Sequence, residues 1–205
     1  MKEKFYLVQI GVSYSSPVFL PYSVGCIAAY LKRDEEIMKH YDIPDIIVMR
    51  EKIEDVLKRF DDPSIVAFSC FTWNIEYNKT LAIELKKRFP SVKIVFGGHS
   101  VPHGGSFLEE YDFIDFLMHN EGEETTALFL KALISGESLY NVPNLSFRAE
   151  DGIVTTEFRH PCDLSSYPSP YTDGIFDNIM KENPDKEFHA TLETNRGCPY
   201  VCTYC

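Results

Sequence analysis

Short apolar runs alternate with amphipathic segments along about the first 135 residues of the chain. Runs of this length without polar alternation are typical of strands that are buried on both faces of a parallel sheet. Between them, apolar residues recur at helical spacing, and Ser23 precedes the first such segment as a candidate N-cap. The pattern predicts strands at residues 5–10, 45–49, 64–69, 92–96 and 113–118, and helices at 24–32, 52–60, 76–89, 106–111 and 123–134.

This alternation favours the α/β class, as a doubly wound five-stranded parallel sheet covered by helices on both faces. The strand order expected for such a fold is 2-1-3-4-5, numbered along the chain. Ligands of open parallel sheets bind at the carboxyl ends of the strands, so the loops that follow the strands are the first place to look for chemistry.

The pattern changes after Gly136. Residues 144–148 and 153–158 read as two strands joined by a turn that contains Asp151-Gly152, which predicts a β-hairpin. A proline-rich stretch at 161–171 then predicts a linker or a strap, and residues 188–193 predict a last strand. We therefore divide the chain into an α/β domain (1–140), a hairpin and linker (141–187) and the start of another domain (188–205).

Net charge, apolar runs and cysteine content limit the kinds of partner and the cellular location that the chain is expected to have. The 205 residues carry a formal net charge of −11, which disfavours binding to nucleic acid or to an anionic membrane. The chain opens directly on a strand without the layout of a signal peptide, and no apolar run approaches the roughly 18 residues of a membrane span. A cytoplasmic location is expected, where clustered cysteines indicate metal or redox sites and isolated ones indicate buried apolar packing. The isolated ones are Cys26, Cys70 and Cys162.

Three further cysteines, Cys198, Cys202 and Cys205, form a C-x3-C-x2-C motif. Thiolates crowded on one loop are good ligands for a soft metal. Three of them leave one iron of a [4Fe–4S] cluster without a protein ligand, so that iron can bind a substrate. The alternative is a three-cysteine zinc site, but a structural zinc site usually has four protein ligands and no fourth is close in sequence. Arg196, just before the motif, is expected to balance negative charge there.

Residues 193–205 resemble the opening of a radical SAM domain. That resemblance implies that Cys198, Cys202 and Cys205 hold a [4Fe–4S] cluster whose open iron binds S-adenosylmethionine, with Tyr204 close to the adenine. It also implies reductive cleavage to a 5′-deoxyadenosyl radical, with electrons from a donor such as flavodoxin or ferredoxin. Residues 188–193 would be the first strand of the partial barrel, and the chain would be the N-terminal fragment of such an enzyme, ending at the third cluster cysteine.

Four stretches follow predicted strands, at residues 11–22, 69–74, 97–100 and 120–125. Ser69, Gly97-Gly98 and Glu121-Gly122-Glu123 in them resemble the cobalamin-binding domain of the B12-binding radical SAM family. In that reading the small residues leave room for the nucleotide tail of cobalamin, and helix N-termini bind its phosphate and amides. The expected cofactor contacts are Tyr14, Tyr22, Ser69, Trp73, Asn74, Gly97, Gly98, His99, Glu121, Gly122, Glu123 and Thr125.

One departure bears on the cofactor. Cobalamin domains of mutase type carry D-x-H-x-x-G after the first strand, and its histidine ligates cobalt. The loop at residues 11–17 holds no histidine, so cobalamin is expected to bind without a protein histidine ligand. Tyr14, Tyr22 and Trp73 either face the cobalt or fill the pocket, whereas His99 and His103 are more typical of surface histidines.

The resemblance implies methyl transfer, or another radical reaction, at an unactivated carbon of a small-molecule substrate. The alternative is a radical SAM enzyme whose first domain binds no cobalamin and serves as a structural or docking cap. A receiver domain is disfavoured, because Gly11 and Ser69 stand where its acidic cluster and phosphoacceptor aspartate would be.

Overall fold

A computed structural model describes residues 2–12, 17–160, 164–194 and 196. Its centre is a seven-stranded sheet of order β3-β1-β4-β5-β6-β7-β8. The first five strands in this order are mutually parallel, and they give the predicted 2-1-3-4-5 order. Their bounds are β3(Tyr41–Asp42), β1(Glu3–Val8), β4(Pro63–Ser69), β5(Lys93–Gly97) and β6(Phe116–Met118).

The edge strand differs from the one predicted at residues 45–49. The structure has β3 at Tyr41–Asp42 and then a single bridge between Val8 and Ile47. Pro44 lies between these two contacts and has no N–H to donate, so the ladder is interrupted there.

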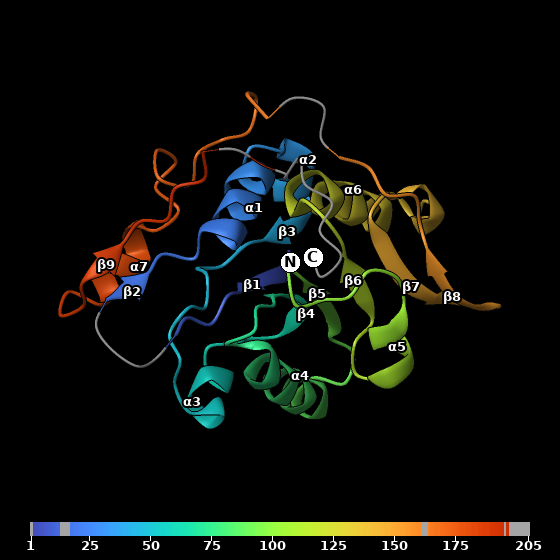
Figure 1. The fold of residues 1–205 in the computed structure, drawn as a ribbon, viewed down its shortest axis with the longest axis horizontal. Coiled ribbons are helices and arrows are strands. Elements are labelled where there is room, and N and C mark those ends of the chain that lie inside the picture. The colour runs from blue at the N-terminus through green and yellow to red at the C-terminus, as the bar shows by residue number, and fades with distance from the viewer. Residues whose placement is uncertain (1, 13–16, 161–163, 195, 197–205) are drawn as a thin grey trace, which may run out of the picture.

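Helices cover both faces of the sheet (Figure 1). One face carries α1(Tyr22–Lys32), α2(Glu35–His40) and α6(Gly122–Ser135), and the other carries α3(Ile53–Leu57), α4(Ile75–Arg88) and α5(Ser106–Glu110). Alternate residues of β1 serve the two cores, with Phe5 and Leu7 on the first face and Tyr6 and Val8 on the second. The short α2 was not predicted; Asp34 caps it by accepting hydrogen bonds from the amides of Glu36 and Ile37 at 3.1 Å each.

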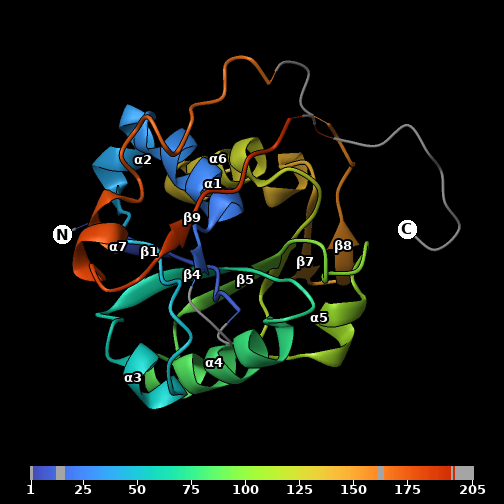
Figure 2. The ribbon, with the colours of Figure 1, turned by 60° about the vertical axis from the view of Figure 1, so that its left-hand side comes forward.

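The predicted hairpin is confirmed, and it extends the central sheet. A 3-10 turn at Leu139–Asn141 leads into β7(Leu145–Ala149), which pairs antiparallel with β6 and with β8(Gly152–Thr155). In Figure 2, β7 and β8 lie on the side of β5 that is away from β1 and β4. Apolar periodicity identified these strands, but it does not say which strand they pair with.

Residues 164–176, which follow the hairpin and precede α7, pack over α1, and we call them the strap. Phe176, 2% exposed, precedes α7(Asp177–Glu182) and lies against Gly25, where a Cβ atom would be 2.3 Å from its ring. Arg33 donates two hydrogen bonds to Asp173, at 2.9 and 2.8 Å. The strap therefore shares the core of the α/β domain.

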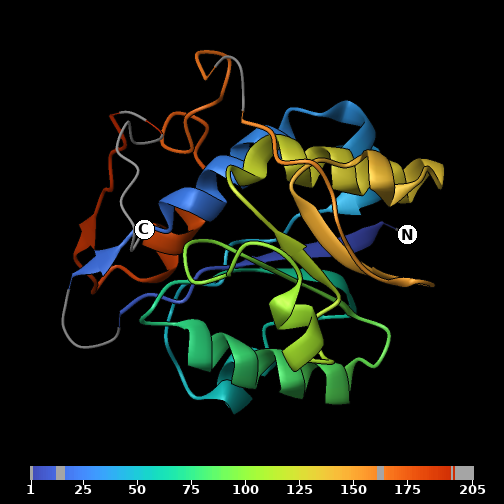
Figure 3. The ribbon, with the colours of Figure 1, turned by 45° about the vertical axis from the view of Figure 1, so that its right-hand side comes forward.

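A second, two-stranded sheet pairs β2(Val18–Phe19) in parallel with β9(Phe188–His189) (Figure 3). The last strand is predicted over residues 188–193 but is two residues long. Beyond His189 the backbone is hydrogen-bonded to the side chain of Tyr171, at Thr191, and not to a neighbouring strand. Among the residues described, no helix is long and apolar enough to cross a bilayer.

Candidate functional site

The carboxyl ends of β1 and β4 lie side by side at the point where the strand order reverses. Of the residues that the structure describes, three polar side chains gather there. The hydroxyl of Ser23 donates to Gln9 Oε1 at 2.7 Å and lies 3.2 Å from the hydroxyl of Ser69. We call Gln9, Ser23 and Ser69 the switch-point group, because open α/β sheets bind their ligands at such a reversal.

Two members of the switch-point group change the sequence interpretation. Ser23 does not cap α1, because the N-cap of this helix is Pro21, which makes no side-chain hydrogen bond. The hydroxyl of Ser23 donates to the side chain of Gln9 instead. Gln9 was not among the predicted site residues. A glutamine at the end of the apolar run Phe5-Tyr6-Leu7-Val8 was the signal that could have indicated it.

The side chain of Asn74 links the ends of β1 and β4 by hydrogen bonds to their backbone. It is fully buried, its Nδ2 donates to the carbonyls of Ile10 and Ser69 at 3.0 Å each, and its Oδ1 accepts from the amide of Phe71 at 2.7 Å. These bonds connect the loop after β1 to the loop after β4. Asn74 therefore positions the switch-point group, whereas a direct contact with a cofactor stays a prediction.

Flat side chains flank the switch-point group on the α4 side. Phe71 and Trp73 stack with ring centroids 4.5 Å apart at 3°, and His99 lies 5.8 Å from Phe71. Trp73 is 44% exposed, although Arg50 holds its backbone by donating to its carbonyl at 2.8 Å. We call Phe71, Trp73 and His99 the aromatic shelf. An exposed, pre-stacked aromatic surface is suited to packing against another flat ring.

The predicted glycines serve close packing within the protein. Gly98 has φ +99°, and a Cβ atom there would lie 2.8 and 2.9 Å from the backbone O and N of Cys70. A Cβ on Gly97 would lie 3.3 Å from the carbonyl of Met118, and one on Gly122 would lie 2.7 Å from Ile27. The room expected for a nucleotide tail is thus filled by protein on the side where each Cβ would point.

The predicted residues of the first turns of α6 all have protein partners. Glu121 lies 3.4 Å from His160, Thr125 accepts from Asn144 at 3.2 Å, and Glu123 accepts from Arg196 at 2.7 Å. Glu121 and Thr125 line a cavity of about 380 Å³ between α6 and the strap.

Tyr22 begins α1 beside the strap, and its ring lies 6.0 Å from that of Tyr171. Burial, followed by its interactions with Cys26, raises the pKa of Tyr22 to about 12, so the hydroxyl keeps its proton at neutral pH.

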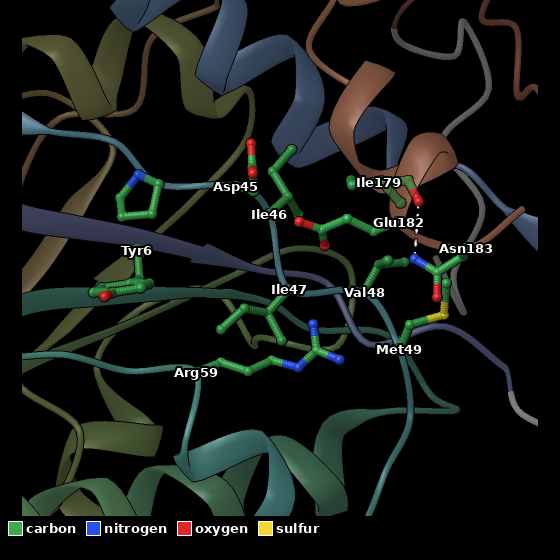
Figure 4. Close-up of a pocket in the computed structure, with 11 residues that line it drawn as sticks. Tyr6, Asp45, Ile46, Ile47, Val48, Met49, Arg59, Ile179, Glu182 and Asn183 are labelled. Atoms are coloured by element: carbon green, nitrogen blue, oxygen red, sulfur yellow. Dashed lines mark hydrogen bonds between the residues drawn. The ribbon is translucent and has the colours of Figure 1, made fainter.

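A separate cavity of about 220 Å³ lies at the β3 edge of the sheet, between residues 44–49 and α7 (Figure 4). Tyr6, Arg59 and Glu182 are among its lining residues, and the side-chain Nδ2 of Asn183 donates to the carbonyl of Ile179 at 2.8 Å. No predicted site residue lines this cavity, so it is not part of the candidate site.

Cys26 and Cys70 are buried thiols, as predicted for isolated cysteines. Burial raises the pKa of Cys70 to about 12, which keeps it protonated. The remaining predicted site residues and the third isolated cysteine lie outside the described residues: Tyr14, Cys162, Cys198, Cys202, Tyr204 and Cys205.

His119, at the end of β6, is a buried titratable group that the sequence did not single out. It is 3% exposed, its Nε2 lies 2.8 Å from the hydroxyl of Ser146, and its ring stacks on that of His103 at 5.7 Å. Burial, and then the charge of His103, lower its pKa to about 4.

We expect His119 to make stability depend on pH. The unfolded chain takes up a proton near pH 6.5 and the folded protein only near pH 4, so stability is lost as pH falls through that window. The loss is about 2–3 kcal/mol by pH 4. Urea unfolding at pH 7.5 and 4.5 should show this loss for the native protein and for the exposed-histidine control His40→Asn, and much less for His119→Asn. Equal pH dependence in all three proteins would contradict the assignment.

The chain is similar in sequence to proteins of known family. The B12 binding domain family matches residues 11–130. The chain is 32% identical over 192 residues to the cobalamin-dependent radical SAM methyltransferase TokK of Streptomyces tokunonensis, and 31% identical over 193 residues to a 2-(S-pantetheinyl)-carbapenam-3-carboxylate methyltransferase of Streptantibioticus cattleyicolor. Each match covers 91% of this chain and 28% of the relative, so the chain spans less than a third of these relatives' length.

Solved structures show the same fold. The cobalamin-dependent S-adenosylmethionine radical enzyme OxsB, with aqua-cobalamin and S-adenosylmethionine bound, superposes with a TM-score of 0.75 at 22% identity. That match covers all of this chain and 28% of OxsB. The radical S-adenosylmethionine methyltransferase TsrM from Kitasatospora setae, with cobalamin and a [4Fe-4S] cluster bound, gives a TM-score of 0.61 at 15% identity over 82% of this chain and 31% of TsrM.

Proposed function

The chain belongs to the B12-binding domain family, and on that premise we propose that it binds cobalamin at the carboxyl ends of β1 and β4 as the N-terminal part of a radical SAM enzyme. The observation that carries the proposal is the exposed aromatic shelf beside the polar switch-point group. Both lie mainly in the residues that the family match covers, and both face the edge where an open α/β sheet binds its ligand.

The side chains present fit a corrinoid. Cobalamin combines a flat corrin ring, an edge of amides and a nucleotide tail. The rings of Phe71 and Trp73 would pack against a flat face, and the hydroxyls of Ser23 and Ser69 would bond amides. No histidine stands between residues 9 and 22, so the loop after β1 supplies no imidazole to cobalt.

The cysteine motif carries the second half of the proposal. Cys198, Cys202 and Cys205 would hold a [4Fe–4S] cluster that leaves one iron open to S-adenosylmethionine. When bound, the cluster and S-adenosylmethionine supply a substrate radical and cobalamin supplies a methyl group, while the protein positions them and excludes water. The methyltransferases among the relatives support methyl transfer to an unactivated carbon of a small molecule. Electrons would come from a donor such as flavodoxin or ferredoxin in the cytoplasm.

A second candidate, a structural or docking cap that binds no cobalamin, is favoured by one observation. Gly97, Gly98 and Gly122 all have their Cβ directions filled by protein, so these glycines are explained by packing alone. The two candidates differ in whether the aromatic shelf receives a ring.

Trp73 is the single tryptophan of the chain, so its fluorescence reports on the shelf directly. We expect hydroxocobalamin, which absorbs at the emission wavelength of tryptophan, to quench Trp73 saturably, and the protein to keep a corrinoid absorption band through desalting. Trp73→Ala should lower the affinity about tenfold, the loss of roughly one stacked aromatic contact of about 1.4 kcal/mol. Because this variant has lost the single tryptophan, its affinity is measured from the change in the corrinoid absorption bands on binding.

Tyr140→Ala is the matched control, because Tyr140 is another exposed aromatic side chain, 59% exposed, outside the candidate site. It should bind hydroxocobalamin as the native protein does. If the native protein shows linear quenching and no retained corrinoid, the cobalamin proposal fails and the cap remains.

A further inference from the structure

The segment that leads into the cysteine motif lies on the α/β domain and is held there at several places. The amides of Val18 and Leu20 donate to the carbonyls of Glu187 and His189 at 2.8 and 2.9 Å. In Figure 3, β9 lies beside β2, which belongs to the loop after β1. The loop at the switch point and the segment before the motif therefore share one small sheet.

Tyr171 of the strap holds the same segment two residues further on. Its hydroxyl donates to the carbonyl of Thr191 at 2.6 Å and accepts from the amide of Thr191 at 2.9 Å. Its ring lies against that of Tyr22, at the start of α1. The path of the segment across α1 is thus determined by backbone contacts up to residue 191 (Figure 2).

Among the described residues, the last contact of the segment with the domain is an ion pair between Arg196 and Glu123, at 2.7 Å. Their side chains are only 17% and 5% exposed. Arg196 also donates to Glu193 at 2.8 Å, and its guanidinium lies 5.6 Å from the ring of Tyr167. A charge withdrawn from water to this degree needs a partner with good geometry, so each of the two residues requires the other.

This pairing concerns two residues for which the sequence predicts other roles, and those roles stay predictions. Glu123 was expected to contact a cofactor, and Arg196 to balance charge at the cluster; in the structure each neutralises the other. Burial would by itself lower the pKa of Arg196, but the hydrogen bonds and charges of Glu123 and then Glu193 raise it, so the guanidinium stays charged.

The pair lies where three elements meet. Glu123 is in the first turn of α6, Gly122 beside it packs on Ile27 of α1, and Arg196 stands two residues before Cys198. A change in direction of the chain at Arg196 would be carried directly into the position of the first cysteine, because only Gly197 separates them.

We infer that Glu123 and Arg196 are a positioning pair, whose contact sets where the cysteine motif begins relative to the switch-point group. This inference rests on the proposed function. It assigns the pair no contact with either cofactor; the pair acts by holding the two sites in one arrangement.

The test uses the full-length enzyme that carries this chain, reconstituted with iron, sulfide and hydroxocobalamin. Glu123→Gln removes the charge and keeps the shape, and Arg196→Lys keeps the charge but loses the two-pronged geometry. Glu187→Gln is the control, since it removes an exposed carboxylate 3.0 Å from His189 in the same segment. The readouts are cobalamin affinity from the corrinoid absorption bands, iron content, and the change in the electron paramagnetic resonance spectrum of the reduced cluster on adding S-adenosylmethionine.

For Glu123→Gln we expect cobalamin affinity within twofold of the native enzyme and at least a tenfold loss of S-adenosylmethionine affinity, measured by that spectral change. Arg196→Lys should lie in between, and Glu187→Gln should match the native enzyme. A native-like spectral change in Glu123→Gln overturns the inference.

Two further outcomes remain decisive. If Glu123→Gln does not fold, the double variant Glu123→Leu, Arg196→Leu is used, because it removes both buried charges at once. This variant should fold, bind cobalamin and show the same loss of S-adenosylmethionine affinity. If its S-adenosylmethionine affinity is native, the inference is overturned. If the native enzyme itself holds neither a cluster nor a corrinoid, the proposed function fails. If the native enzyme holds both and Glu123→Gln keeps its S-adenosylmethionine affinity, the proposed function stands and only the positioning role of the pair fails.

Discussion

Gly98→Ala is expected to destabilise the protein by about 3 kcal/mol or more and to abolish corrinoid retention. Two effects add at this position. An alanine at φ +99° is strained whatever the space around it, and its Cβ would lie 2.8 Å from the carbonyl oxygen of Cys70. The contact is with backbone, which cannot rotate away, so the loop after β5 must move from the loop after β4. His99 of the aromatic shelf would move with it.

Gly104→Ala is the matched control for this prediction. Gly104 has φ +86°, close to that of Gly98, but a Cβ there would meet nothing within 4 Å. It should therefore lose only the conformational part, about 1–2 kcal/mol, and keep its corrinoid affinity. Urea unfolding and Trp73 quenching measure the two effects. Equal losses in both variants would show that the close approach to Cys70 does not matter.

Asn74→Leu should be the other severe substitution, with a loss of about 3–5 kcal/mol. Leucine fills a similar volume but leaves the carbonyl of Ile10, the carbonyl of Ser69 and the amide of Phe71 without the bonds that Asn74 makes. Buried backbone groups without partners are expensive. Because Phe71 stacks on Trp73, we expect the emission of Trp73 to change as well.

Asn78→Leu provides the comparison, four residues further along the chain. Asn78 is also fully buried, but its amide makes longer contacts, 3.3 Å to the carbonyl of Ser69 and 3.5 Å to the sulfur of Cys70. Its Oδ1 has no hydrogen-bond partner among the described residues. We expect Asn78→Leu to lose less than half as much as Asn74→Leu. If Asn78→Leu loses more unfolding free energy than Asn74→Leu, the positioning role assigned to Asn74 is wrong. Urea unfolding at neutral pH measures both.

The parallel part of the fold was predictable because its information is local. Runs such as Ile65-Val66 and Ile94-Val95-Phe96 lack polar alternation, and only a sheet covered on both faces buries every residue of such a strand. The edge strand was misplaced because an edge has one neighbour and tolerates the interruption at Pro44. The sequence identified the hairpin but not its neighbour, since periodicity specifies which face is buried and not which strand lies alongside.

The candidate site was predicted in part. Residues directly after strands, such as Ser69 and Trp73, were found because the carboxyl ends of parallel strands share one edge. Gln9 and Ser23 were missed as site residues, because their meeting depends on how α1 is placed over β1. The ion pair of Glu123 with Arg196 was not predicted, because Arg196 lies 73 residues away and no local pattern joins the two.

The sequence by itself determined the α/β class, the alternation of strands and helices and the cysteine motif, because apolar spacing and cysteine spacing are properties of neighbouring residues. Only the tertiary structure decided which polar groups meet. It brought Ser23 to Ser69, Cys70 to Gly98 and Arg196 to Glu123. These contacts join residues far apart in the chain, and they depend on angles and distances between packed elements that no local pattern records.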